Sequence, residues 1–209
     1  MLIKIRNRQA EMLNPLYICS KVNLPGMTNH NAISRYSVVI SIIAAGALFR
    51  FIPHWPNFTP VAAIALFGGA YAGRKYLAFL IPFAAMFLSD LVLGFHAYMG
   101  AVYLAFGLTV MIGLLLRGRT GIQNVVMASL SSSVLFYLIT NFSAWLASPL
   151  YPNTFTGLME SYIAGLAFFN NGSLGLSFFL NEVAGTLFYS GIFFGVYAVA
   201  KQRMPALAR

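Results

Sequence analysis

Long apolar runs separated by short polar breaks occupy most of the chain after residue 36. An α-helix rises about 1.5 Å per residue, so roughly 20 apolar residues cross the hydrocarbon core of a bilayer. The runs predict helices at 37–52, 61–72, 76–95, 98–116, 125–147 and 176–200. A connector, 148–175, precedes the last, with a short amphipathic helix expected near 157–169. The pattern predicts an all-α, polytopic membrane protein with about six transmembrane helices.

The run 61–72 is the shortest of the six, and it follows a proline-rich segment, 53–60. Even counted from Phe58 to Gly73 it would extend over only about 24 Å. A protein with five spans, or with a re-entrant second element, therefore stays open as an alternative.

Basic residues favour the six-span arrangement. Lysine and arginine follow the second, fourth and sixth runs and recur in the N-terminal segment, whereas the other connectors hold none apart from Arg50 at the end of the first run. Lys and Arg concentrate in cytoplasmic loops, so both termini are expected inside a bacterial cytoplasmic (inner) membrane. We expect a basic, flexible cytoplasmic tail over 1–35, a transmembrane domain over 36–201 and a short cytoplasmic tail over 202–209.

Composition narrows the class further. Of 209 residues 59% are hydrophobic and 8% are charged, whereas soluble domains carry about 25% charged residues. The net charge of +9 does not indicate nucleic-acid binding, because the basic residues lie between apolar runs. The single cysteine, Cys19, cannot form an internal disulfide and lacks the neighbours of a zinc site.

Polar residues within the runs are the main candidates for a site, because ionisable side chains in hydrocarbon are costly. Those expected near the outer face are Arg50, Asp90, His96, Asn141, Trp145 and Glu182. Structural roles remain open for each. Arg50 and Asp90 could neutralise one another, a helix N-terminus could stabilise Glu182, and Trp145 could be an interfacial anchor.

Two further features bear on function. The segment 53–60 contains three prolines besides Asn57 and Thr59, and it could form either a lid over an outer pocket or a plain rigid turn. Small residues recur at four-residue spacing at Ser41 and Ala45, and at Ala65, Gly69 and Gly73. Such faces allow close helix packing, either inside the protein or against a partner.

Enzymatic chemistry is not expected. The chain contains no convincing nucleophile–base pair, no phosphate loop of the type Gly-x-x-x-x-Gly-Lys, and no metal-ligand motif. We expect no cofactor and no metal, and any use of ATP would require a separate subunit.

Two stretches carry a resemblance, PNFTPVAAIALFGGAY at 56–71 and FLSDLVLGFH at 87–96, followed by Thr140-Asn141-Phe142 and Trp145. They resemble an uncharacterised family of bacterial membrane proteins described as transport proteins. That family is similar to the substrate-binding S components of energy-coupling factor (ECF) vitamin transporters, which bind a micronutrient in an outward pocket under the loop between helices 1 and 2.

The resemblance implies that the polar candidates, with Asn57 and Thr59, contact a small-molecule substrate. It also implies docking through small residues of helix 1 to a transmembrane subunit driven by ATPases. S components often show Ala-x-x-x-Ala there, whereas this chain has Ser41-x-x-x-Ala45, so a solitary transporter stays open. The alternative from another class is a membrane structural or assembly protein that does not transport.

Overall fold

The structure is a computed structural model that describes residues 29–95, 98–167 and 177–204. Within these ranges the protein is all-α and has seven helices: α3 (Asn29–Phe49), α4 (Val61–Tyr71), α5 (Lys75–Leu93), α6 (Met99–Leu115), α7 (Ile122–Ala147), α8 (Phe155–Ala167) and α9 (Phe178–Arg203). The apolar runs therefore predicted the helices correctly, and α8 confirms the helix expected in the connector. The first helix begins at Asn29, inside the segment predicted as a tail.

The helices identify a multi-pass membrane protein by their length and hydropathy. Three of them, α5, α7 and α9, are long and apolar enough to cross a bilayer. The shorter apolar helices are α4, α6 and the part of α3 from Arg35 to Phe49. Large apolar side chains such as Leu115, Met127 and Val196 project outward. Such a surface is unfavourable in water and suits lipid.

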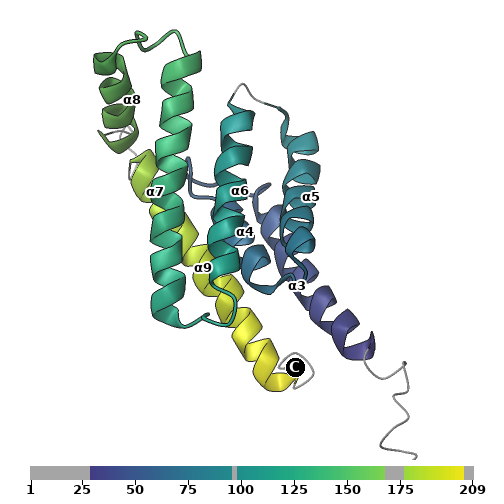
Figure 1. Cartoon of the computed structure of the whole chain (residues 1–209). Coiled ribbons are helices and arrows are strands. Elements are labelled where there is room, and N and C mark those ends of the chain that lie inside the picture. Colours follow the sequence, from purple (N-terminus) through teal and green to yellow (C-terminus); the bar gives the residue numbers. More distant parts are fainter. Residues whose placement is uncertain (1–28, 96–97, 168–176, 205–209) are drawn as a thin grey trace, which may run out of the picture.

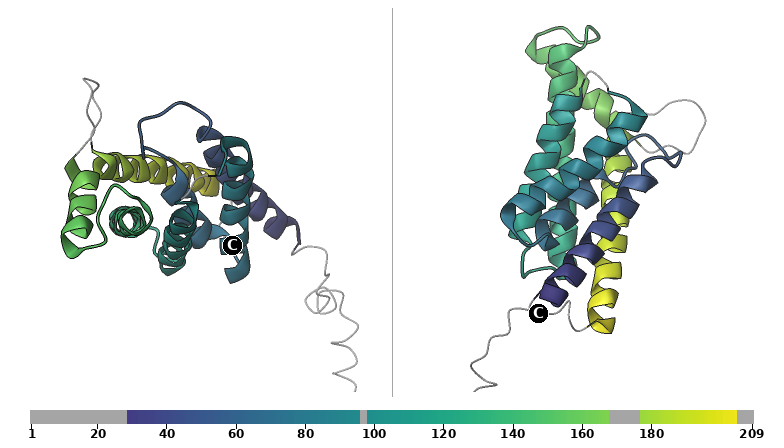
Figure 2. Two further views of the ribbon diagram at one scale, coloured as in Figure 1. Left: turned by 90° about the horizontal axis from the view of Figure 1, so that it is seen from above. Right: turned by 90° about the vertical axis from the view of Figure 1, so that its right-hand side faces the viewer.

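The chain passes up and down between two ends of the bundle (Figure 1). The start of α3, the turn between α4 and α5, the turn between α6 and α7 and the end of α9 lie together at one end, as Figure 2 also shows. We call this the basic end, because these segments carry Arg35, Arg74, Lys75, Arg117, Arg119, Lys201 and Arg203. We call the other the loop end; the connection from α7 to α8 forms its tip, and segment 50–60 lies on this side of the basic end but nearer the middle of the bundle (Figure 1).

Helix α4 is the centre of the fold. It contacts α3, α5, α6, α7 and α9, and every residue from Val61 to Ala70 is buried. Its 11 residues reach about 16 Å, half the thickness of the hydrocarbon core. The second expected span is thus a half-length internal helix, and segment 50–60 provides the rest of the passage from the loop end.

Small residues explain why α4 can sit so close to α6. A Cβ atom added to Gly69 would lie 2.5 Å from the Val110 carbonyl oxygen and 2.7 Å from the Gly113 Cα. One added to Gly113 would lie 2.5 Å from the Leu66 carbonyl oxygen. The two backbones therefore touch, which only glycine permits at these positions.

The C-terminal end of α4 is buried and depends on a side chain from outside the helix. Arg117 Nε donates a hydrogen bond to the Gly69 carbonyl oxygen at 3.0 Å. The last carbonyl groups of a helix have no partner within it and carry partial negative charge. The guanidinium satisfies one of them and complements that charge, so Arg117 has a structural role at the end of α4.

Candidate functional site

Arg50 and Asp90 form an ion pair where the end of α3 meets the end of α5. Arg50 Nη2 lies 2.6 Å from Asp90 Oδ1, and the two side chains are 14% and 7% exposed. Asp90 Oδ2 accepts a hydrogen bond from the Tyr103 hydroxyl of α6 at 2.8 Å. Arg50 Nη1 donates to Ser89 Oγ and to the Met86 carbonyl oxygen. Both charges are therefore neutralised, and the arrangement fastens α3, α5 and α6 together.

The proline-rich segment 53–60 is attached to the start of α9. Asn181 Nδ2 donates to the Pro56 carbonyl oxygen at 2.9 Å, and Asn57 Nδ2 donates to the Phe178 carbonyl oxygen at 3.5 Å. Asn57 has φ 62°, a conformation that asparagine tolerates better than most residues. A Cβ atom added to Gly185 of α9 would lie 3.0 Å from the Thr59 nitrogen. The backbone of the segment at Thr59 therefore packs closely against α9.

Glu182 is buried in α9, one residue after Asn181. Its side chain is 4% exposed, and its Oε1 accepts a hydrogen bond from the Thr186 hydroxyl at 3.0 Å. At the start of α9 the Leu180 nitrogen is capped by the Ser177 hydroxyl instead. The carboxyl group thus bonds to a side chain and not to a free N–H of the helix terminus.

Asn141 and Trp145 belong to a third region, where α7 contacts α8 and the turn before it. Trp145 Nε1 donates to the Pro152 carbonyl oxygen at 3.0 Å. Asn141 Nδ2 bonds to the Tyr137 carbonyl oxygen of its own helix at 2.9 Å, and its amide lies against Gly165 of α8. Trp145 thus ties α7 to the turn before α8, whereas Asn141 only packs against α8.

The predicted outer residues therefore do not share one pocket among the described residues. They divide into the Arg50–Asp90 pair, the loop with the start of α9, and the contact of α7 with α8; His96 lies outside the described residues. Tyr103 and Ser89, which complete the first group, were not predicted, because a tyrosine or serine in an apolar helix gives no signal of its partner.

A cavity of about 570 Å³ lies at the loop end. We call it the loop cavity, and it is lined by Phe49, Ile52, Pro53, His54, Trp55, Phe58 and Tyr189. Its wall is aromatic, with the rings of Trp55 and Phe58 5.9 Å apart and those of Phe58 and Tyr189 5.7 Å apart.

One imidazole contributes polarity to the loop cavity. His54 Nδ1 lies 2.6 Å from the Ile52 carbonyl oxygen. Because that oxygen can only accept, Nδ1 carries the proton, and Nε2 is an acceptor in the neutral ring. A lid over an outer pocket was one of the two alternatives for segment 53–60, and the aromatic residues of α3 and α9 that complete the wall of this cavity were not predicted.

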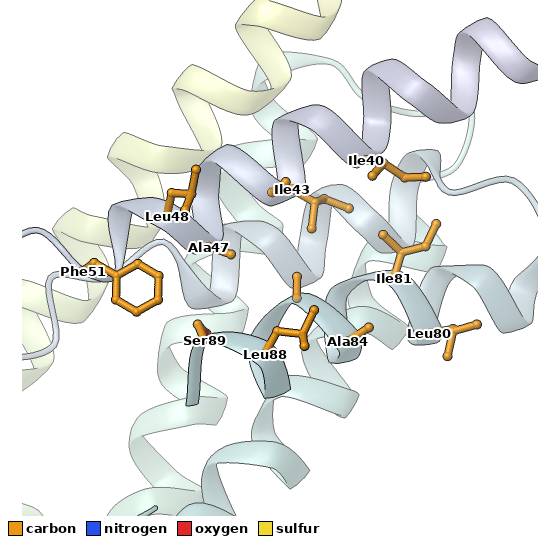
Figure 3. Close-up of a pocket in the computed structure, with 12 residues that line it drawn as sticks. Ile40, Ile43, Ala47, Leu48, Phe51, Leu80, Ile81, Ala84, Leu88 and Ser89 are labelled. Carbon is orange, nitrogen blue, oxygen red and sulfur yellow. The ribbon is translucent and has the colours of Figure 1, made fainter. Parts of the chain in front are cut away.

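A second cavity, of about 480 Å³, is an apolar groove between α3 and α5. Figure 3 shows Ile40, Ile43 and Leu48 of α3 facing Leu80 and Leu88 of α5 across it. We call it the α3–α5 groove. Its apolar lining is open to the lipid side of the bundle.

The small-residue candidates divide into buried and more exposed positions. Ala65 and Gly69 are buried in α4, so they serve internal packing. Gly73 forms the turn after α4 with φ +70°. Ser41 and Ala45 are exposed on α3, and of the five they are the ones that a partner could reach along a helix.

We expect Asn181→Ala to loosen segment 53–60 without unfolding the bundle. It removes the donor of a partly buried hydrogen bond to the Pro56 carbonyl oxygen, which costs about 0.5–1.5 kcal/mol, so hydrogen exchange at the Phe58 amide should accelerate roughly two- to tenfold. Asn124→Ala is the matched control, because its amide bonds to Arg119 at the basic end. Equal exchange rates at Phe58 in both variants would contradict the anchoring role.

Comparison with known proteins gives one match. Residues 30–207 match the model of a family described as "Family of unknown function (DUF6580)". No match was found among curated proteins or among solved structures.

Proposed function

Because the chain belongs to the family of unknown function DUF6580, we propose its function from its own geometry: it is the substrate-binding subunit of a membrane transporter, similar to ECF S components. The substrate is a small micronutrient, and its site is the loop cavity. We further propose that six passages place the basic end in the bacterial cytoplasm and the loop end outside, as the distribution of Lys and Arg favours.

The observation that carries this proposal is the non-helical segment beside the loop cavity. Within a membrane, irregular backbone is tolerated only where protein buries it or where it borders a cavity. Transporters use discontinuous helices of this kind to build substrate sites. Here segment 50–60 precedes the half-length α4, and Pro53 to Trp55 line the cavity that Tyr189 closes from α9.

The size and lining of the loop cavity indicate the substrate class. Ligand sites commonly enclose about 300–1,000 Å³ and combine apolar walls with few polar groups. A cavity of about 570 Å³ with aromatic walls and one imidazole fits a small molecule with a flat apolar portion and a hydrogen-bond donor. Trp55, His54 and Tyr189 would contact it.

Energy would come from partners. Following the resemblance, a transmembrane subunit with ATPases would contact the exposed Ser41 and Ala45 of α3. The chain itself supplies binding and release.

Substrate binding can be followed through Trp55. The chain has two tryptophans, so Trp145→Phe leaves Trp55 as the only one. A panel of water-soluble vitamins and their precursors should include a compound that changes Trp55 fluorescence saturably and raises Tm.

Matched aromatic variants localise the effect. Tyr189→Ala should abolish the response, whereas Phe142→Ala, which removes an exposed ring outside the cavity, should keep it. A panel that changes neither fluorescence nor Tm, or a response that survives Tyr189→Ala, would contradict the proposal.

The α3–α5 groove favours a second candidate, a membrane assembly protein that does not transport. Its apolar lining and the neighbouring exposed Ser41 and Ala45 could accept a helix of another membrane protein. Stable co-purification with a partner unrelated to transport, lost in Ala45→Leu and kept in Val199→Leu on the exposed side of α9, would support this candidate.

A further inference from the structure

The interface of α7 and α9 contains a column of buried polar side chains in an otherwise apolar bundle. Glu182, Thr186 and Ser190 follow at four-residue spacing along α9, so they share one face. Ser129 and Ser133 share a face of α7 in the same way. All five are at most 4% exposed. We call these five residues the polar seam.

The register of α7 against α9 indicates which residue of α9 lies level with Ser133. Ser129 Oγ donates to Ser190 Oγ at 3.2 Å, and α7 and α9 are antiparallel (Figure 1). Because both helices rise by the same distance per residue, four residues forward on α7 correspond to four residues back on α9. Ser133 is therefore level with Thr186, the residue that donates to Glu182.

Hydrogen bonding within the seam is incomplete. Ser133 Oγ is fully buried and has no hydrogen-bond partner within the part of the chain that the structure describes. The Oδ1 atom of Asn181, next to Glu182, is also buried and without one. Unsatisfied buried oxygens are uncommon and call for a ligand, an ion or water. Along the helix axis, Ser133 is thus about one turn from Glu182, and Asn181 is the preceding residue in the chain.

No charged side chain compensates Glu182 among the described residues. Arg50 is engaged with Asp90, and the Glu182 carboxyl group accepts a hydrogen bond from the Thr186 hydroxyl. The titratable groups on neighbouring elements are occupied or peripheral: the Tyr137 hydroxyl of α7 donates to the Tyr162 carbonyl of α8, and His54 is exposed and bonded to Ile52. An isolated carboxylate at this depth would be very costly.

We propose that the polar seam is a binding site for one monovalent cation, either a proton on the Glu182 carboxyl group or an ion of the size of Na⁺. The oxygen donors available to an ion are the carboxylate of Glu182 and the hydroxyls of Thr186 and Ser133, a hard set suited to such ions. A divalent metal is disfavoured, because no group of three His, Cys, Asp or Glu side chains occurs in the described ranges.

The position of the site also suggests what the cation does. Asn181 holds the Pro56 carbonyl oxygen of segment 53–60 and directly precedes Glu182. A change in the charge of Glu182 would therefore act on the turn of α9 that anchors the wall of the loop cavity. This coupling of cation and substrate rests on the proposed function, whereas binding of the cation does not.

The test uses purified full-length protein without substrate. In one arm Tm is measured against Na⁺ at constant ionic strength, with choline as the replacement. In the other, infrared difference spectra follow the carboxylic acid band against pH in the absence of Na⁺. We expect a saturable response in one arm, which identifies the cation, and its loss in Glu182→Gln.

Two serine variants keep the test decisive if Glu182→Gln does not fold. Ser133→Ala should shift half-saturation by about tenfold, the usual effect of removing one supporting polar group. Ser132→Ala is the matched control, because this buried hydroxyl already bonds to the Ala128 carbonyl, and it should match the wild type. Identical responses in wild type, Glu182→Gln and Ser133→Ala would overturn the proposal.

The two proposals can fail separately. A Na⁺ or proton response that disappears in Glu182→Gln, in a protein that binds no compound of the vitamin panel, would support the cation site and reject the transport subunit. Substrate binding with no response in either arm would support the transport subunit and reject the cation site.

Discussion

Gly69→Ala should lower Tm by roughly 6–12 °C, because it forces apart two helices at the centre of the fold. The added Cβ would meet the Val110 carbonyl oxygen at 2.5 Å and the Gly113 Cα at 2.7 Å. Both atoms belong to the α6 backbone, which cannot turn aside as a flexible side chain can. Overpacking commonly costs about 1–3 kcal/mol, and we expect the upper end, about 3 kcal/mol, equivalent to about 2–4 °C per kcal/mol in a chain of this size.

Gly195→Ala is the matched control for that substitution. Gly195 is also helical, and nothing lies within 4 Å of an added Cβ. Alanine has a helix propensity up to about 1 kcal/mol better than glycine, so Tm should stay equal or rise. A Gly69→Ala protein as stable as Gly195→Ala would show that α4 does not pack on α6 as described.

Arg50→Met should be the most destabilising change at the loop end. It leaves the buried Asp90 carboxylate with the Tyr103 hydroxyl but without its cation. Removing one partner of a buried ion pair typically costs about 3–5 kcal/mol, and the low exposure of both side chains argues against strong solvent screening. Thermal unfolding in detergent measures the loss. Arg119→Met removes an exposed arginine at the basic end and should change little.

The double variant Arg50→Met/Asp90→Asn should recover most of the lost stability. The neutral amide introduced by Asp90→Asn needs no cation, and the amide oxygen can still accept the hydrogen bond from the Tyr103 hydroxyl. Replacing a whole buried pair by neutral groups is often close to neutral. Recovery would identify the pair as structural. A double variant as unstable as Arg50→Met, or single variants with unchanged Tm, would indicate that these side chains have another role.

Much of the helical structure could be predicted from the long apolar runs of the sequence. Helix α4 could not be understood that way. Its residues read as a short span, but their burial on every side depends on contacts with five other helices. The Gly69–Gly113 contact joins positions far apart in sequence, and spacing within one run does not reveal such a pairing.

The site was predictable by residue type but not by grouping. Ionisable residues within apolar runs singled out Arg50, Asp90 and Glu182, which the structure finds largely buried, and the pairing of the first two was one of the expected alternatives. Similar depth in the membrane did not imply a shared pocket, because depth says nothing about position around the bundle axis. The aromatic wall of the loop cavity carries no polar signal, so Phe49 and Tyr189 looked like ordinary packing residues.

The central claim is that segment 53–60 borders a substrate cavity that opens outside the cell. It can be tested by introducing Ile52→Cys, at a cavity-lining position that is given no substrate contact, in a Cys19→Ser background, which leaves one cysteine in the chain. A membrane-impermeant maleimide should label this cysteine in intact cells, and the compound that changes Trp55 fluorescence should slow the labelling. Labelling only after permeabilisation, or labelling at the same rate with that compound present, would contradict the account.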